Sequence, residues 1–161
     1  MVGKELNGLL IDAMTVADLP EVLTIEKASF KTPWSETLFY NEIFKTIALP
    51  RLARINGKVV GYLCANVIID EGHILNLAVH PEYRGRGIAS RMIQEILETL
   101  RADNCRSVFL EVRVSNEEAR KMYEKFGFVL LGTRKNYYIS PVEDASVMVL
   151  RLTIDKAIEE N

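Results

Sequence analysis

The stretch that decides the fold is Arg84-Gly85-Arg86-Gly87-Ile88-Ala89, where an apolar strand over residues 73–79 gives way to an amphipathic helix. Glycines at such a turn let the backbone approach a ligand, and the first amides of the helix have no partners within the helix. The helix dipole and the two arginine charges attract anions to the same place. The turn therefore predicts a site for the pyrophosphate of a cofactor, although a tight connection with exposed arginines has the same pattern.

Length and composition predict one soluble globular domain. The chain has 161 residues, 48% of them hydrophobic and 26% charged, and a chain of this length buries roughly two thirds of its unfolded surface. We expect a domain over residues 1–154 and a polar tail over residues 155–161. No apolar run is long enough to cross a membrane, and the first residues lack a secretory signal pattern. The chain is therefore expected in the cytoplasm, without a membrane partner.

Charge and residue usage argue against several classes of site. The net charge of −2 gives no basis for broad nucleic-acid binding, although the two arginines of the turn form a local basic patch. Cys64 and Cys105 lie in apolar segments without metal-ligand spacing, so buried thiols are expected rather than a disulfide. His73 and His80 match no ligand pattern and are expected to be structural or surface residues. No metal is therefore expected.

Local signals place the helices and turns. Thr15 and Asp18 have the spacing of a capping box at the start of a helix, and Ser35 is a good cap for a second helix. Asn56-Gly57 lies between two apolar segments and predicts a type I′ hairpin. A further turn is expected at Glu71-Gly72, and a loop over residues 136–144. The helix after the glycine turn has a predicted buried face of Ile88, Ala89, Met92, Ile93, Ile96, Leu97 and Leu100.

These signals give an order of strand, two helices, three strands, helix, strand, helix and two strands. We expect strands near residues 9–14, 51–55, 58–63, 73–79, 107–114, 128–135 and 146–153. We expect helices near residues 15–28, 35–46, 88–100 and 116–127. Parallel crossovers are needed only around the last two helices. The order predicts an α/β (α+β) fold with a mixed, mostly antiparallel sheet and helices on both faces.

The element order and the turn, with its pattern Arg-x-x-Gly-x-Ala, resemble the GNAT superfamily of acetyl-coenzyme A-dependent N-acetyltransferases. The resemblance covers nearly the whole chain and implies that acetyl-coenzyme A is the acetyl donor. In that family the matching turn binds the coenzyme pyrophosphate through backbone amides, and the preceding strand binds the pantetheine arm. By resemblance, the coenzyme-binding residues are Leu77, Ala78, Val79, Arg84, Gly85, Arg86, Gly87, Ile88, Ala89 and Ser90.

A more specific resemblance lies in residues 110–116, 119–128, 136–138 and 143–145. These segments are similar to the branch that acetylates protein N-terminal α-amines, which includes bacterial ribosomal-protein alanine N-acetyltransferases and archaeal N-terminal acetyltransferases. The resemblance implies a ribosomal-protein partner and acetylation of the N-terminal alanine of small-subunit ribosomal protein eighteen. Two alternatives stay open: broader N-terminal or lysine substrates, and a domain that binds acyl-coenzyme A without catalysis.

The expected reaction needs a deprotonated amine and a proton for the departing thiolate. Glu111 lies on an otherwise apolar strand, where burial should raise its pKa, and the resemblance makes it the proton acceptor. The alternative is a simple ion pair with Arg113 or a helix cation. The resemblance gives Tyr123 the role of protonating the coenzyme sulfur, whereas an ordinary core tyrosine is the alternative. Asn116 matches a coenzyme contact, which is compatible with a helix cap.

The acceptor side is expected to include aromatic residues on two loops. An α-amine with a pKa of about 8 needs only a modest base at neutral pH. No serine or cysteine has a plausible histidine partner, so direct attack by the amine is expected. Glu36 and Glu42 are expected to be solvated helix positions. Residues that resemble the walls of the family's peptide slot, or that instead form a local core under the loops, are Phe30, Pro33, Trp34, Tyr137 and Tyr138.

Overall fold

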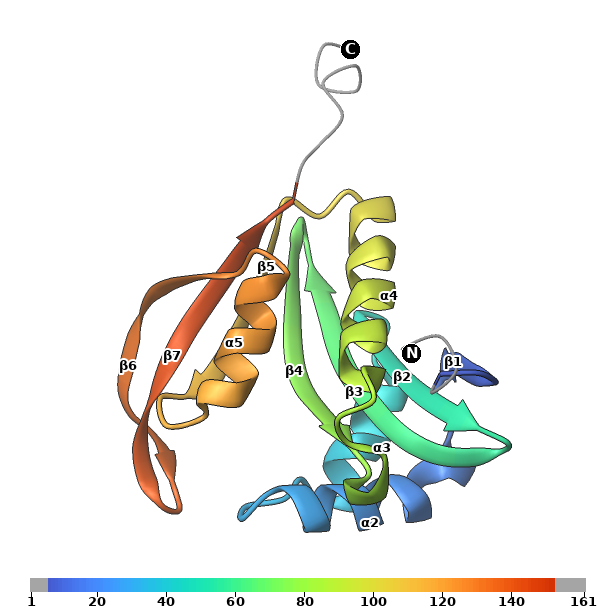
Figure 1. The fold of residues 1–161 in the computed structure, drawn as a ribbon. Coiled ribbons are helices and arrows are strands. Elements are labelled where there is room, and N and C mark those ends of the chain that lie inside the picture. Colours follow the sequence, from blue (N-terminus) through green and yellow to red (C-terminus); the bar gives the residue numbers. More distant parts are fainter. Residues whose placement is uncertain (1–5, 153–161) are drawn as a thin grey trace, which may run out of the picture. The chain divides into compact units, whose positions relative to one another are not determined.

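Residues 6–152 are described by a computed structural model, and their helices and strands follow the expected order (Figure 1). The expected tail over residues 155–161 lies outside the described residues. Hydrogen-bonded strands follow the order β1-β2-β3-β4-β5-β7-β6, which confirms a mixed, mostly antiparallel sheet. The strands are β1 (Leu9–Ala13), β2 (Ala48–Ile55), β3 (Lys58–Ile68), β4 (Glu71–Val79), β5 (Ser107–Arg113), β6 (Val129–Ile139) and β7 (Val142–Arg151). The helices are α2 (Leu19–Ser29), α3 (Glu36–Phe44), α4 (Ile88–Ala102) and α5 (Glu117–Lys125), with short 3-10 turns η1 (Val16–Asp18) and η2 (Pro81–Tyr83).

The local signals for helix starts and the first hairpin are confirmed. The backbone N–H and hydroxyl of Thr15 both donate to the Asp18 carboxylate at 2.8 Å, which completes the capping box before α2. Ser35 Oγ accepts a hydrogen bond from the Leu38 N–H at 3.2 Å and caps α3. Asn56 and Gly57 both have positive φ, 50° and 79°, as a type I′ turn requires. This turn joins β2 and β3 in antiparallel pairing.

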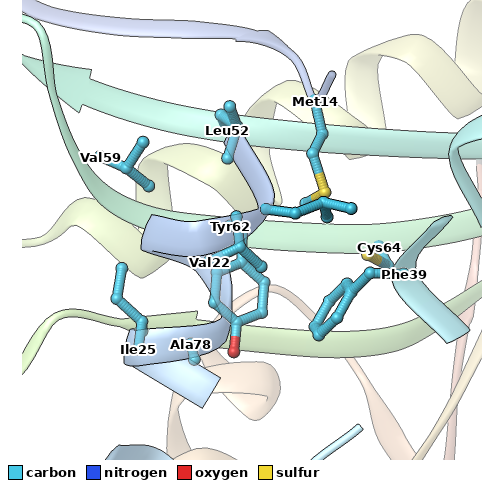
Figure 2. Close-up of a cluster of buried hydrophobic side chains, with 10 residues drawn as sticks. Met14, Val22, Ile25, Phe39, Leu52, Val59, Tyr62, Cys64 and Ala78 are labelled. Atoms are coloured by element: carbon cyan, nitrogen blue, oxygen red, sulfur yellow. The ribbon is translucent and has the colours of Figure 1, made fainter. Parts of the chain in front are cut away.

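One compact unit, the first unit, comprises residues 6–66 and 75–97. Helices α2 and α3 cover one face of its sheet with a hydrophobic core cluster around Tyr62 (Figure 2). The Tyr62 ring meets Phe39 edge to face, with centroids 5.5 Å apart. At the preceding residue, Gly61, the opposite face of the strand lies against Met92 and Ile88 of α4. Helices therefore cover both faces of the sheet in this unit, as predicted.

A second unit comprises residues 67–74 and 98–152. The first four residues of β4 pair in parallel with β5, so the crossover through α4 is confirmed. Strand β7 pairs antiparallel with both β5 and β6, and the long β6–β7 hairpin is visible in Figure 1. Strands β5 and β6 are therefore parallel to each other but separated by β7.

The prediction of a loop over residues 136–144 is wrong. Strand β6 continues to Ile139 and β7 begins at Val142, so the chain reverses at residues 140–141. Asn136 has a φ of 52° and lies in an irregular part of the ladder, after which pairing resumes at Tyr138 opposite Glu143. The polar residues that suggested a loop lie instead in and beside this irregular part of the hairpin. Tyr137 and Tyr138 consequently lie on a strand.

Other element boundaries differ by a few residues. The turn expected at Glu71-Gly72 lies at residues 69–70, where Ile69 has a φ of 58°, and Glu71 begins β4. Helix α3 ends at Phe44, two residues before the expected end. Cys64 and Cys105 are free and buried, as predicted. In the described part of the chain, no helix is long and apolar enough to span a membrane.

Replacing Gly61 with alanine should destabilise the fold. A Cβ atom at this position would lie 2.9 Å from Met92 Cε and 3.0 Å from the carbonyl oxygen of Ala78, and the backbone carbonyl has little room to move. Overpacking of this kind costs about 1–3 kcal/mol of unfolding free energy, measurable by urea denaturation. Gly132→Ala is the matched control, because a Cβ there meets no atom within 4 Å. Equal losses in both variants would contradict close packing at Gly61.

Asp18→Asn should lower stability at neutral pH but not in acid. Burial alone would raise the pKa of Asp18, but hydrogen bonds from Thr15 and Arg54 outweigh it and hold this pKa below its ordinary value of 3.8. A depressed carboxylate pKa stabilises the fold above 3.8, and that contribution is lost as the pH falls through the lower native value. We expect a difference of about 1–3 kcal/mol at pH 7 that closes in acid. Denaturation at pH 7 and in acid measures the difference. Asp12→Asn, at an exposed position of β1, is the control and should change the unfolding free energy at pH 7 by no more than about 0.5 kcal/mol.

Candidate functional site

The glycine turn of the first unit has the geometry predicted for anion binding. Gly85 and Gly87 have φ values of 77° and 85°, a left-handed conformation that glycine adopts without strain. Helix α4 begins at Ile88, and the Arg91 N–H donates to the Gly87 carbonyl at 3.1 Å. The amides before Arg91 belong to the first turn of the helix, where no intrahelical acceptor is available. The turn thus presents backbone donors at the positive end of the α4 dipole.

The two arginines of this turn also brace it. The Arg84 guanidinium donates to the Val79 carbonyl and to Ser29 Oγ, both at 3.1 Å. Arg86 donates to the Glu82 carbonyl at 3.3 Å, and its guanidinium lies 4.9 Å from the centre of the Tyr83 ring. Both side chains therefore add positive charge and fix the turn against neighbouring segments of the first unit. Expected coenzyme residues Leu77, Ala78 and Val79 form the end of β4, and Ala89 and Ser90 lie half-buried in the first turn of α4.

Glu111 lies on β5 in the second unit, where its surroundings differ from the expectation. Its side chain is 29% exposed and accepts a hydrogen bond from Arg134 of β6 at 2.8 Å. The Tyr137 hydroxyl donates a second hydrogen bond to the same carboxylate. The prediction of a desolvated carboxyl is therefore wrong. The alternative ion pair with Arg113 or a helix cation is also wrong, because β6 supplies the cation.

The Glu111 carboxylate alters the chemistry of Tyr137. The pKa of Tyr137 is raised, mainly because its hydroxyl is hydrogen-bonded to Glu111, and burial and the Glu111 charge add to the effect. Arg134 opposes this shift, and its guanidinium lies 4.8 Å from the centre of the Tyr137 ring. Glu111, Arg134 and Tyr137 thus form one cluster in which the carboxylate is held from two sides.

A second ion pair fixes the tip of the β6–β7 hairpin. Arg113 contacts Glu143 at 3.3 Å and donates to the two carbonyls of the hairpin turn at 3.0 and 3.2 Å. Hydrogen bonds from Ser115, together with Arg113, hold the pKa of Glu143 below its usual value. The Arg113 guanidinium also lies 4.2 Å from the centre of the Tyr138 ring. These residues belong to the segments that carry the family resemblance. The sequence did not predict that they would fix the tip of the β6–β7 hairpin.

Tyr123 is a buried side chain of α5. Its ring meets Phe128 at a centroid distance of 5.6 Å. Burial raises the pKa of Tyr123 well above its ordinary value, and the neighbouring Tyr138 contributes further. The hydroxyl consequently stays protonated at neutral pH. Asn116 caps the same helix by accepting the Ala119 N–H at 3.2 Å, which confirms its capping role.

The expected peptide-contacting aromatics differ in exposure. On the loop after α2, Phe30 is 38% exposed and Pro33 is also exposed. Trp34 is half-buried and packs against the core cluster, with its ring centroid 5.2 Å from that of Phe39. On β6, Tyr137 is exposed, whereas Tyr138 is half-buried beside it.

Sequence reasoning missed two buried glutamates of the first unit. Glu26 of α2 is 1% exposed and accepts hydrogen bonds from Tyr62, Asn76 and the backbone N–H of Trp34. Glu42 of α3 was expected to be solvated but is buried. Its carboxylate forms an ion pair with Lys45, with 2.7 Å between Nζ and Oε1. The spacing of Leu19, Val22 and Glu26 could have predicted the burial of Glu26, because helical residues three and four apart share one face.

Comparisons with known proteins agree with this geometry. Residues 19–128 match the sequence profile of the acetyltransferase (GNAT) family. A Bacillus subtilis protein, provisionally named a [ribosomal protein bS18]-alanine N-acetyltransferase, is 36% identical over 136 residues, which are 84% of this chain and 90% of the relative.

Solved structures show the same fold. The ribosomal-protein-S18-alanine N-acetyltransferase from Escherichia coli superposes with a TM-score of 0.85 and 30% identity, over 91% of this chain and 96% of that chain. Ard1 from Thermoplasma volcanium superposes with a TM-score of 0.84 and 27% identity, over 91% of this chain and 99% of that chain.

Removing the Glu111 charge should shift the titration of Tyr137. In Glu111→Gln, the pKa of Tyr137 should fall toward 10.0, because the hydrogen bond to a carboxylate no longer favours the protonated hydroxyl. The shift can be followed by NMR of tyrosine labelled with carbon-13 at Cζ. Glu118→Gln, at an exposed position of α5, is the control and should leave the titration unchanged. An unshifted Tyr137 in Glu111→Gln would exclude the hydrogen bond between the two side chains.

Proposed function

The chain belongs to the GNAT family and is an acetyl-coenzyme A-dependent N-acetyltransferase; we propose that its acceptor is the N-terminal alanine of ribosomal protein bS18. The provisional name of the Bacillus subtilis relative and the name of the structurally similar Escherichia coli enzyme support this acceptor. We infer that the activity takes place in the cytoplasm, where an acceptor of this kind is made. The archaeal Ard1 structure has a similar TM-score, so other N-terminal acceptors are the second candidate.

The observation that carries the proposal is the state of Glu111 and Tyr123 within the second unit. Glu111 presents a partly exposed carboxylate, held by Arg134 and Tyr137, that can accept a proton. The Tyr123 hydroxyl is protonated at neutral pH, and we propose that it gives this proton to the departing thiolate. We therefore assign Glu111 as the proton acceptor and Tyr123 as the proton donor in a direct acyl transfer to an amine.

In the proposed reaction, the amine nitrogen attacks the thioester carbonyl carbon, and a carbon–nitrogen bond forms as the carbon–sulfur bond breaks. Glu111 takes the proton lost by the amine, and Tyr123 gives its proton to the sulfur. The products are an N-acetylated peptide and the free thiol of coenzyme A. An α-amine suits this base because its pKa of about 8 lies much closer to neutrality than the lysine value of about 10.4.

We assign the coenzyme and peptide contacts by the same reasoning. The amides of the turn from Arg84 to Ser90 are proposed to bind the pyrophosphate, and this fits their positive-φ glycines and free helix start. The end of β4, Leu77 to Val79, is proposed to bind the pantetheine arm, with Asn116 as a further contact. Proposed peptide contacts are Phe30, Pro33, Trp34, Tyr137 and Tyr138.

Acetyl transfer to a peptide that begins with the N-terminal sequence of bS18 tests the proposal. Glu111→Gln should lower kcat by about 100-fold or more, because general base catalysis typically contributes a factor of this size. Tyr123→Phe should lower kcat through loss of the proton donor. Release of coenzyme A thiol gives the rate, and Glu118→Gln is the control variant.

Three outcomes separate the alternatives. Equal rates for Glu111→Gln and the unmodified protein would remove Glu111 from the mechanism. Selective acetylation of lysine side chains, detected by mass spectrometry, would contradict an α-amine acceptor. Coenzyme binding without transfer to any amine would favour a non-catalytic acyl-coenzyme A sensor.

A further inference from the structure

Glu26 is a buried carboxylate for which the proposed reaction has no use. Its side chain lies in the first unit, and the residue is 1% exposed. Within residues 6–152, no lysine, arginine or histidine lies within ion-pair distance of it. A charge removed from water without a counter-charge is costly unless several donors replace the lost water. The burial of Glu26 is therefore explained only if such donors surround it.

Three donors converge on the two carboxylate oxygens. Oε1 accepts the Tyr62 hydroxyl and the Asn76 side-chain amide, the latter at 2.8 Å. Oε2 accepts the backbone N–H of Trp34 at 2.8 Å. An amide N–H can only donate, so two of these three bonds require an acceptor at Glu26. Burial and the hydrogen bond to Glu26 also raise the pKa of Tyr62, which keeps its hydroxyl a donor.

Glu26 holds both ends of the loop after α2. Its backbone carbonyl accepts the Phe30 N–H at 3.0 Å, and its carboxylate accepts the Trp34 N–H at 2.8 Å. The first and last backbone N–H groups of the segment from Phe30 to Trp34 are therefore both hydrogen-bonded to Glu26. Tyr62 from β3 and Asn76 from β4 in turn fix the carboxylate, so the loop is tied to the sheet of the first unit.

We propose that Glu26 is a positioning residue that sets the conformation of the Phe30–Trp34 loop and thereby the affinity for the acceptor peptide. This inference rests on the proposed function, since Phe30 and Pro33 of this loop are proposed peptide contacts. Glu26 is too deeply buried to touch the peptide and acts through the loop backbone. Tyr62 and Asn76 keep the carboxylate aimed at the Trp34 amide.

Glu26→Gln is the direct test because it preserves size and removes one acceptor oxygen. If the new amide nitrogen faces the Trp34 N–H, that hydrogen bond is lost. If it faces the other side, the Tyr62 hydroxyl and the Asn76 amide must turn their oxygens toward it, so the anchor is rearranged in either case. We expect the KM for the peptide to rise about tenfold, as expected for loss of one hydrogen bond to a charged group. The KM for acetyl-coenzyme A and kcat should stay within about threefold of the unmodified values.

Trp34 supplies a readout that does not depend on activity. It is the only tryptophan in the chain, so tryptophan fluorescence excited selectively over the tyrosines reports on this loop alone. In Glu26→Gln, the hydrogen bond that holds the Trp34 backbone is weakened, so the Trp34 side chain should be more exposed to water and more mobile. Its fluorescence should therefore shift to longer wavelength and show lower anisotropy. Glu42→Gln is the matched control, because Glu42 is also a buried helix glutamate of the first unit but contacts Lys45. It should leave both the peptide KM and the emission unchanged.

A peptide KM within about twofold of the unmodified value, together with unchanged Trp34 emission, would overturn the inference. The same changes in Glu42→Gln would also overturn it, because they would reflect general loss of packing. If Glu26→Gln does not fold, Glu26→Asp keeps the charge but shortens the reach, and the same two shifts are expected. If the unmodified protein acetylates no peptide, the proposed function fails, and the Trp34 emission of the same variants still decides the role of Glu26 in holding the loop.

Discussion

The close approach of α4 to the sheet at Gly61 is the constraint on which the glycine turn over residues 84–89 depends. Gly61 has no side chain, so the Met92 and Ile88 side chains and the Ala78 carbonyl come within contact distance of its position. This packing fixes the beginning of α4 and the end of β4 within the same unit. The short connection between them must then reverse tightly, and left-handed glycines at 85 and 87 allow it to do so with its amides exposed.

Charge in the second unit is organised in two pairs that hold neighbouring tyrosines. Arg134 pairs with Glu111 and lies over Tyr137, and Arg113 pairs with Glu143 and lies over Tyr138. Each guanidinium thus contacts both a carboxylate and an aromatic face, which its flat, delocalised charge suits better than a lysine ammonium. The arrangement gives Glu111 a fixed orientation while leaving its side chain partly exposed.

Particular residues show how far sequence reasoning reached. The structure confirms the predicted capping box at Thr15 and Asp18 and the Asn56-Gly57 turn. It also confirms the predicted buried stripe of α4 except at Ala89, which is half-buried. The loop over residues 136–144 was wrong because its polar composition is the same in a loop and in an exposed, irregular edge strand. The prediction of a desolvated environment for Glu111 was wrong because an apolar strand does not reveal which charge another strand, here β6, brings to it.

The sequence by itself determined the element order, the caps, the glycine turn and the resemblance that identifies the acetyl donor. These depend on residues a few positions apart, where backbone sterics and local hydrogen bonds act alone. Only the tertiary structure decided that Arg134 is the partner of Glu111 and that Tyr62 and Asn76 converge on Glu26. Those partners are separated by 23, 36 and 50 residues along the chain. No local pattern specifies such contacts, because they exist only after strands and helices have packed.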